Sequence, residues 1–344
     1  MKIANFELNK GRTFIIAELS ANHGHDIEVA LETIRAAKRA GADAIKLQTY
    51  TADTITLDCN KEDFIIKDTI WKGKKMYELY QEAALPWEWH ADLFKVAQEL
   101  DLICFSSPFD KTAVDFLEKF NVPAFKIASF EIIDIPLIEY IAKKGKPIII
   151  STGIADDKDI QLAVDTCAKV NNTDIVLLKT SSQYPAKIED ANMQMMPDLA
   201  KRFNVLSGLS DHTTGNLVPI IATSLGAVII EKHFILNKNI GGVDASFSLD
   251  ENEFKQMVDA VRNTEKALGK IDYSLSKKAE KSRVFSRSLY IVENIKKGEI
   301  FNEKNLRSIR PGYGLHPKYL PEILGKKANQ NLFKGMRFSL DFIA

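Results

Sequence analysis

Short apolar runs rich in β-branched residues alternate with amphipathic segments along the first 270 or so residues of the chain. Eight such runs occur, and each is followed by a segment with helical periodicity. Their apolar residues are continuous rather than alternating, which is typical of strands buried on both faces in a parallel sheet. The runs are FIIAEL from Phe14, AIKLQTY from Ala44, LICFSS from Leu102, AFKIAS from Ala124, PIIIST from Pro147, IVLLKTS from Ile175, VLSGLS from Val205 and VIIEKHF from Val228.

The number and length of these units favour a closed α/β barrel. Eight strand–helix units in about 270 residues match the size and repeat number of a (β/α)₈ TIM barrel. Several predicted helices are followed by glycine, the usual residue at a helix end: Gly41, Gly145, Gly226 and Gly269. A doubly wound open sheet is the alternative, but no G-x-G-x-x-G motif follows the first strand. We therefore predict a TIM barrel over residues 1–275.

The alternation stops near Lys277. The stretch KKAEKSR is charged and poor in apolar residues, so we predict a linker over residues 276–284. Short strand-like pieces with turn signals follow, and they predict a small domain over residues 285–344. So small a unit buries little apolar surface, and we expect it to rest on a partner surface. Residues 50–77 form a long insertion after the second strand, and such loops are usually functional.

Composition excludes several classes of protein. The chain has 344 residues, with 46 basic and 46 acidic side chains, so nothing indicates a nucleic-acid or membrane-surface partner. The three cysteines show no C-x-x-C spacing, and Cys104 and Cys167 fall in apolar segments, as reduced core residues would. No apolar run reaches membrane-spanning length and no signal peptide is evident, so we expect a cytoplasmic protein.

Polar side chains stand at the carboxyl end of all eight predicted strands. In a barrel these ends meet at one mouth, where active sites lie, whereas the layered interior prefers branched apolar residues. A complete set therefore indicates a built polar site. Its members are Glu18, Lys46, Gln48, Ser106, Ser107, Lys126, Ser129, Glu131, Ser151, Thr152, Ser181, Ser182, Tyr184, Ser210, Asp211, His212, Glu231 and His233.

Two lysines within this set predict an anion site. Lys46 and Lys126 would act as point charges, and the hydroxyls around them would donate to phosphate or carboxylate oxygens. A solvated or salt-bridged side chain is the alternative for Lys126, but FKIAS places it between apolar residues at a strand end.

His212 and His233 predict a metal site beside these lysines. Two neutral imidazoles that converge on one point, with carboxylates nearby, commonly hold a divalent transition metal. Alternatively, each histidine is a hydrogen-bonded polar residue at a strand end. A metal next to an anion site favours the joining of an anionic substrate to a carbonyl that the metal polarises.

The same motifs carry a family resemblance over nearly the whole chain. ELSANHG, KLQTYT, SSPF, AFKIASFE, ISTG, SQYP, GLSDHT, EKHF and IRPGYG, in this order, resemble the sialic acid synthases. The C-terminal segment is similar to the antifreeze-like (SAF) domain of that family. The resemblance implies the condensation of phosphoenolpyruvate with an N-acetylated amino sugar, a divalent metal, usually Mn²⁺, and a domain-swapped homodimer.

The resemblance also implies roles for individual residues. His212 and His233 match metal ligands, Glu18 and Asp244 match carboxylates that hold the open-chain sugar, and Glu131 matches an acid with a proton-transfer role. Arg310 matches an arginine that reaches the partner's barrel mouth. Positions that bind phosphoenolpyruvate are matched by Lys46, Lys126, Ser107, Ser129, Ser151 and Ser210, and Gln48, Ser182 and Tyr184 complete the expected substrate-binding set.

Local departures bear on which sugar is used. Ser20 stands where the N-acetylneuraminate-forming branch more often has glycine, and Ser182 where asparagine is common. ELSANHG, LQTYTADT and DASFSLD instead resemble the pseudaminic-acid-forming branch, which uses a 2,4-diacetamido-2,4,6-trideoxy-altrose. The N-acetylneuraminate- and legionaminate-forming branches are the alternatives. From other classes, a metal-dependent pyruvate aldolase and a non-catalytic carbohydrate-binding protein also remain open.

Overall fold

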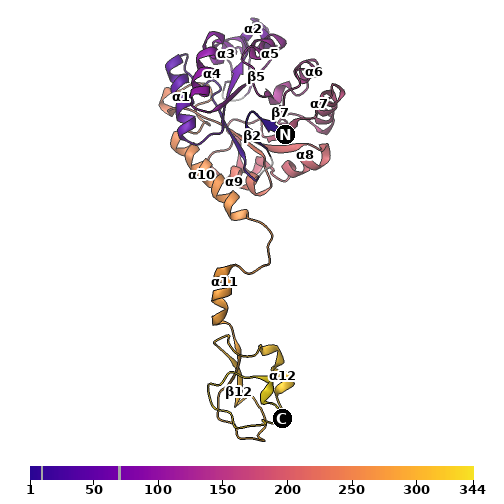
Figure 1. Ribbon diagram of the computed structural model, residues 1–344. Coiled ribbons are helices and arrows are strands. Elements are labelled where there is room, and N and C mark those ends of the chain that lie inside the picture. Colours follow the sequence, from indigo (N-terminus) through magenta and orange to yellow (C-terminus); the bar gives the residue numbers. More distant parts are fainter. Residues whose placement is uncertain (9–10, 69–70) are drawn as a thin grey trace. The chain divides into compact units, whose positions relative to one another are not determined.

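The computed structural model describes residues 1–8, 11–68 and 71–344 of the chain. The chain divides into two compact units, Met1–Gly269 and Lys270–Ala344 (Figure 1).

The first unit is built on a closed barrel of eight parallel strands, which confirms the predicted fold. The strands close in the order β10-β3-β4-β5-β6-β7-β8-β9, so consecutive strands of the chain are neighbours. All eight apolar runs form strands. They are β3 (Phe14–Glu18), β4 (Ala44–Thr49), β5 (Ile103–Pro108), β6 (Phe125–Ile127), β7 (Ile148–Ser151), β8 (Ile175–Thr180), β9 (Leu206–Asp211) and β10 (Ile229–His233).

Helices follow each barrel strand and form the outer ring. Aspartate side chains accept hydrogen bonds from free backbone N–H groups at the first turn of several of them, as at Asp26, Asp110, Asp134, Asp156 and Asp250. The main helices are α1 (Ile27–Arg39), α4 (His90–Glu99), α5 (Lys111–Glu118), α6 (Ile135–Ala142), α7 (Asp157–Lys169), α8 (Met195–Phe203), α9 (Leu217–Ser224) and α10 (Glu251–Leu268). The described helices include none long and apolar enough to span a bilayer.

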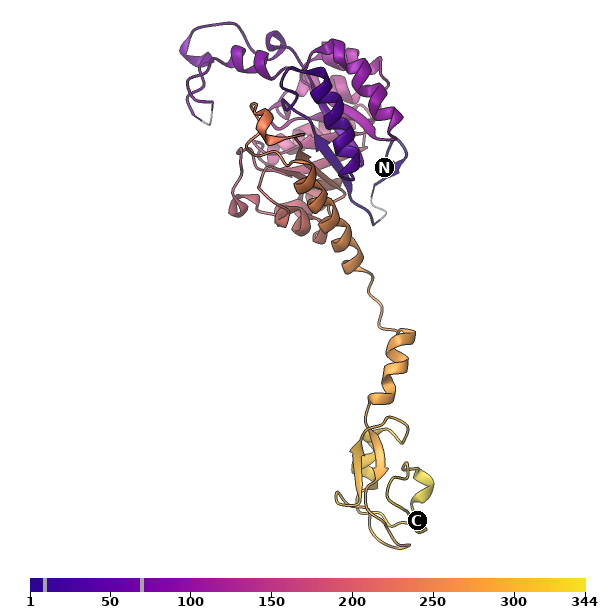
Figure 2. The same ribbon diagram turned by 90° about the vertical axis from the view of Figure 1, so that its left-hand side faces the viewer.

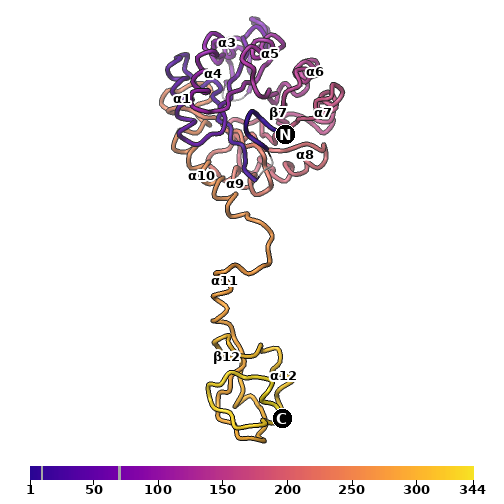
Figure 3. The backbone as a smooth tube through the Cα atoms, viewed as in Figure 1, coloured from indigo at the N-terminus to yellow at the C-terminus, as the bar shows by residue number. Residues whose placement is uncertain are grey.

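The two ends of the barrel carry different additions. A short antiparallel pair, β1 (Lys2–Ile3) and β2 (Phe6–Glu7), precedes the first barrel strand and was not predicted. Its neighbour Leu8 and its own Ile3 are buried in the same core cluster as Phe14, and in Figure 3 the N-terminus lies within the ring of helices. The insertion after β4 lies at the opposite end (Figure 2), and its described part contains α2 (Ala52–Ile55), η1 (Glu62–Phe64) and the start of α3 (Met76–Ala83).

The second unit has a small core of its own. Strands β11 (Ser288–Ile291) and β12 (Leu306–Ile309) pair antiparallel, and Leu289 of β11 is buried in one cluster with Phe301 and Phe338. The stretch predicted as a linker is not irregular, because it contains α11 (Lys277–Ser282) followed by η6 (Arg283–Phe285). Ser276 caps α11 by accepting a hydrogen bond from the backbone N–H of Ala279. The unit also contains the short helices η7 (Pro317–Tyr319), α12 (Leu320–Ile323) and η8 (Leu340–Phe342). The three cysteines are free thiols, and Cys104 and Cys167 are buried as predicted.

A substitution at Gly208 tests how tightly the barrel is packed. A Cβ atom at this position in β9 would clash with the carbonyl oxygen of Ile229 and lie 2.9 Å from Leu178 Cδ2. Because a backbone carbonyl cannot move aside cheaply, we expect Gly208→Ala to lower the free energy of unfolding by about 1–3 kcal/mol. Ser207→Ala adds no atom to the same strand and is the control. Equal unfolding midpoints in urea for Gly208→Ala and the native chain would contradict this packing.

Candidate active site

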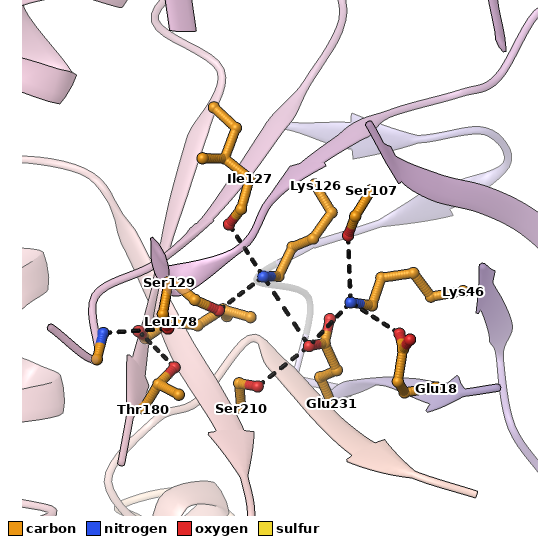
Figure 4. Close-up of polar contacts among 12 residues, drawn as sticks. Glu18, Lys46, Ser107, Lys126, Ile127, Ser129, Leu178, Thr180, Ser210 and Glu231 are labelled. Atoms are coloured by element: carbon orange, nitrogen blue, oxygen red, sulfur yellow. Dashed lines mark hydrogen bonds and ion pairs between the residues drawn. The ribbon is translucent and has the colours of Figure 1, made fainter. Parts of the chain in front are cut away.

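Two buried lysines and a shared carboxylate form the centre of the barrel mouth (Figure 4). Lys46 Nζ lies 2.7 Å from Glu18 Oε2 and 3.3 Å from Glu231 Oε1. Lys126 Nζ lies 4.0 Å from the same Glu231 oxygen. The side chains of all four residues are at most 6% exposed, so these charges balance one another away from solvent. The structure therefore brings together side chains from four barrel strands: Glu18 ends β3, whereas Lys46, Lys126 and Glu231 lie within β4, β6 and β10.

Serine hydroxyls surround this charged centre. Lys46 donates to Ser107 Oγ (3.4 Å), Lys126 donates to Ser151 Oγ (2.7 Å), and Ser210 donates to Glu231 Oε1 (3.1 Å). All three hydroxyls come from the predicted strand-end set. Because each can rotate, each can turn to donate to a bound anion once the internal ion pairs rearrange.

A second group of hydroxyls meets at Gly153, after β7. The backbone N–H of Gly153 donates to Ser129 Oγ (3.3 Å), and Ser182 Oγ is buried with no hydrogen-bond partner. A Cβ at Gly153 would collide with Ser182 Oγ and approach Ser129 Oγ to 2.9 Å, so only glycine leaves this space. Unpaired buried donors are costly, which indicates a place for ligand oxygens.

Burial sets the protonation of the charged centre near neutral pH. Burial lowers the pKa of Lys126 to about 8 and raises that of Glu18 to about 7. Burial also opposes the charge on Lys46, but Glu18 and Glu231 outweigh it and raise the pKa of Lys46. For Glu231, the nearby Lys126 and Lys46 outweigh burial and lower its pKa. Lys46 and Glu231 thus stay charged, whereas Lys126 and Glu18 can change charge between pH 7 and 8.

Glu131 is a third group that titrates in this range. It ends the short helix η3 (Ser129–Glu131) after β6, and its Oε2 is buried without a hydrogen-bond partner. Burial raises its pKa to about 7, although Lys126 acts in the opposite direction. A carboxyl group with this pKa can hold or release a proton at neutral pH, as a general acid or base must.

A polar network occupies the side of the mouth near β3. Glu18 Oε1 accepts from Gln48 Nε2 (3.1 Å) and from the backbone N–H of Ser20 (3.0 Å). The Ser20 hydroxyl donates to Asp244 and accepts from Gln48 Nε2 (3.0 Å). Glu18, Gln48 and Asp244 therefore lie together, as expected for residues that hold one ligand. Burial raises the pKa of Asp244.

The two predicted metal ligands also lie side by side. The His212 and His233 ring centroids are 5.3 Å apart, and Tyr184 packs on His212 at 4.3 Å. Asp244 Oδ2 is 3.7 Å from His233 Nδ1. His212 Nδ1 lies 2.7 Å from the carbonyl oxygen of Ser181, which can only accept, so this nitrogen carries the proton and Nε2 keeps its lone pair.

Comparison with known proteins agrees with this geometry. The NeuB family model matches residues 33–273, and the SAF domain model matches residues 286–336. The chain belongs to the NeuB family. It is 52% identical over 332 residues to pseudaminic acid synthase from Campylobacter jejuni subsp. jejuni serotype O:23/36 (strain 81-176), covering 96% of each chain.

Two further proteins are similar to this NeuB-family chain over most of its length. N,N'-diacetyllegionaminic acid synthase from Legionella pneumophila is 36% identical over 327 residues, covering 94% of this chain and 92% of its own. The crystal structure of N-acetylneuraminic acid synthetase from Leptospira borgpetersenii, in complex with citrate, superposes with a TM-score of 0.73 at 29% identity. That match covers 82% of this chain and 94% of the other.

The donor atoms at the histidine pair fit the divalent metal that the family resemblance implies. Burial lowers the pKa of His212 to about 4 and that of His233 well below its usual value, so both rings are neutral at pH 7 and their free nitrogens could accept a metal ion. His233 Nδ1 is buried with no hydrogen-bond partner. Across the described residues, no cluster of three or more His, Cys, Asp or Glu side chains could hold a metal. An ion here would take its remaining ligands from solvent or substrate, as catalytic sites commonly do.

The sequence missed two parts of this NeuB-family site. Glu231 belongs to the predicted strand-end set, but the sequence assigns it no role, although its Oε1 lies near both lysines. Ser20 distinguishes the branches in the sequence, and in the structure it also joins Gln48 to Asp244 from a left-handed backbone conformation (φ +48°). The role of Glu231 depends on the strand register, and that of Ser20 on its backbone conformation. Arg310 is exposed and belongs to the second unit, so the barrel unit alone does not contain it.

The first site prediction concerns the metal. His212→Ala or His233→Ala should weaken Mn²⁺ binding about 10-fold or more and abolish metal-dependent turnover, because each removes one of few protein ligands. Electron paramagnetic resonance of free Mn²⁺ measures the affinity, and circular dichroism checks the fold. His25→Ala, an exposed histidine after β3, is the control and should bind normally. Near-normal turnover of both ligand variants after chelation and Mn²⁺ addition would refute the assignment.

The second site prediction concerns protons. A bound anion favours the charged form of Lys126 and the protonated form of Glu18. The protein should therefore take up about 0.5–1 proton when phosphoenolpyruvate binds at pH 8. Its affinity should fall as pH rises through about 8, where Lys126 loses its charge. Calorimetry in buffers of different ionisation enthalpy measures this uptake. Lys126→Arg keeps the charge at all these pH values and should reduce the uptake. A binding enthalpy that is independent of buffer would contradict the account.

Proposed function

We propose that the chain is a pseudaminic acid synthase. It would condense phosphoenolpyruvate with 2,4-diacetamido-2,4,6-trideoxy-β-L-altropyranose and water, giving pseudaminic acid and orthophosphate. One observation carries the reaction class: two buried lysines share the Glu231 carboxylate beside a pair of neutral histidines. The greater identity to the Campylobacter jejuni enzyme than to the legionaminic acid synthase supports this choice of sugar.

The lysines and serines would bind phosphoenolpyruvate. Its carboxylate and phosphate would replace Glu231 and Glu18 as partners of Lys46 and Lys126, with Ser107, Ser151 and Ser210 as donors. Ser129 and Ser182 would donate to further oxygens at the space that Gly153 leaves open. Because these groups are buried and already close together, little reorganisation is needed when charge develops on the anion.

The histidines and carboxylates would bind the open-chain sugar. His212 and His233 would hold a divalent ion, proposed to be Mn²⁺, which supplies Lewis acidity to an aldehyde oxygen when bound. Glu18, Gln48 and Asp244 would accept from or donate to hydroxyl and acetamido groups, and Tyr184 packs over the histidine ring. This arrangement orients the aldehyde carbon toward C3 of phosphoenolpyruvate.

The proposed reaction forms one carbon–carbon bond and consumes one water molecule. C3 of phosphoenolpyruvate would attack the aldehyde carbon, and water would add at C2, after which the C2–O bond to phosphate breaks. Glu131 has the protonation range to take a proton from that water. No covalent bond to the protein is required, and the paired histidines make a lysine Schiff base unnecessary.

The second unit of one protomer would complete the active site of its partner in a homodimer. We propose a domain-swapped homodimer, located in the cytoplasm, in which Arg310 enters the partner's barrel mouth and binds substrate. The exposure of Arg310 and the SAF match support this role. A guanidinium group at the mouth would add a permanent positive charge and help to exclude water from the reacting groups.

A panel of substrates tests the reaction and the sugar together. With phosphoenolpyruvate and Mn²⁺, the 2,4-diacetamido-2,4,6-trideoxy sugar should give kcat/KM at least about 10²-fold above N-acetylmannosamine, whose hydroxyls mismatch the pocket. Released orthophosphate and product mass are the measurements. Comparable values for the two sugars would refute the pseudaminate assignment but not the family. Turnover of pyruvate without phosphate release would indicate an aldolase, and no turnover with any sugar would indicate a binding protein.

Mixed dimers test the placement of Arg310. Arg310→Ala and His233→Ala chains should each lose most activity, whereas dimers reassembled from both should regain part of it, because one site then has both residues. Lys318→Ala, which removes another cation of the second unit, is the control. This variant should keep its activity without mixing with a second variant. No activity above either parent, despite verified subunit exchange, would show that Arg310 does not act across the dimer.

A further inference from the structure

A buried ion pair lies behind the two histidines, on the helix-facing side of the barrel. Lys232 Nζ is bonded to Asp211 Oδ2, and their side chains are 0% and 2% exposed. Neither residue belongs to the charged centre at the mouth. Apolar side chains normally fill this layer between strands and helices, as Leu209 and Ile230 do two residues earlier in each strand.

Strand register explains why the pair faces outward. In the parallel pair β9–β10, Ser210 lies opposite Glu231, and Asp211 lies opposite Lys232. Ser210 and Glu231 bond to each other inside the mouth, so the next pair points to the other face of the sheet. At the ends of β9 and β10, the residues that face the mouth and the residues that face the helices are therefore both polar.

The pair also fixes the chain that carries His212. Asp211 Oδ1 accepts from the backbone N–H of Thr213 (3.0 Å) and from its hydroxyl (2.8 Å). Lys232 donates in addition to the carbonyl oxygen of Thr213. Three bonds thus hold the residues on either side of His212, and its ring is directed to the opposite face, where Nδ1 meets the Ser181 carbonyl.

The two members of the pair immediately precede the two histidines, as Asp211–His212 and Lys232–His233. We propose that the buried Asp211–Lys232 pair is a positioning device that sets the spacing of His212 and His233 for a divalent metal. This inference rests on the proposed metal site. Stability is a weak explanation for the pair, because apolar residues often replace a buried ion pair at no cost in stability.

A neutral pair tests the proposal. In Lys232→Met/Asp211→Asn, the asparagine oxygen can still accept from Thr213, and no charge is left unpaired. We expect this variant to unfold within a few degrees of the native protein but to bind Mn²⁺ about 10–100-fold more weakly, the usual effect of losing groups that orient metal ligands. The readouts are the free-Mn²⁺ paramagnetic resonance signal, phosphoenolpyruvate affinity in metal-free buffer and thermal unfolding. Phosphoenolpyruvate affinity should stay within about threefold of native, because Lys46 and Lys126 are untouched.

Lys179→Met is the matched control. Lys179 is a buried lysine on the same outward face of β8, and its Nζ donates to the Thr180 carbonyl (3.0 Å). Its replacement should change Mn²⁺ affinity by less than about threefold. Native Mn²⁺ affinity in the neutral-pair variant, or an equal loss in Lys179→Met, would overturn the inference alone. Failure of the native protein to bind Mn²⁺ would overturn the metal site and the inference together.

Discussion

The sharing of the Glu231 carboxylate by Lys46 and Lys126 is the constraint on which the barrel mouth depends. Two ammonium groups cannot be buried side by side without a counter-charge, since each would lose several kcal/mol of hydration. Glu231 lies 3.3 Å from one and 4.0 Å from the other, and Glu18 adds a second carboxylate at 2.7 Å from Lys46. The resting site is thus neutralised from within, and an anionic substrate would replace those internal partners.

The same closure of the barrel brings the remaining chemistry to this point. Strand β10 pairs with β3 on one side and β9 on the other, which places His233 beside Glu18 and close to His212. Burial then determines the state of each group: it keeps the imidazoles neutral and moves the pKa values of Glu18, Glu131 and Lys126 toward neutrality. Metal-ligand, anion-binding and proton-transfer capacity all follow from one arrangement of strand ends.

Much of this was predictable because a barrel repeats two simple periods. The eight apolar runs predict the eight strands, and the polar residues near the carboxyl ends of these runs include Lys46, Lys126, His212 and His233. Which residues of neighbouring strands lie opposite one another could not be predicted from the sequence. The role of Glu231 depends on a register across two neighbouring strands, and that of Ser20 on an unusual backbone conformation. The β1–β2 pair was missed because two-residue strands leave no periodic pattern.

A crystal structure with Mn²⁺ and phosphoenolpyruvate tests the central claim most directly, namely that this mouth holds an anion on two lysines beside a metal on two histidines. The account predicts oxygens of phosphoenolpyruvate within hydrogen-bond distance of Lys46 and Lys126 Nζ, and Mn²⁺ bound by His212 and His233. Phosphoenolpyruvate bound elsewhere while both lysines keep their contacts with Glu231, or Mn²⁺ bound without either histidine, would contradict it.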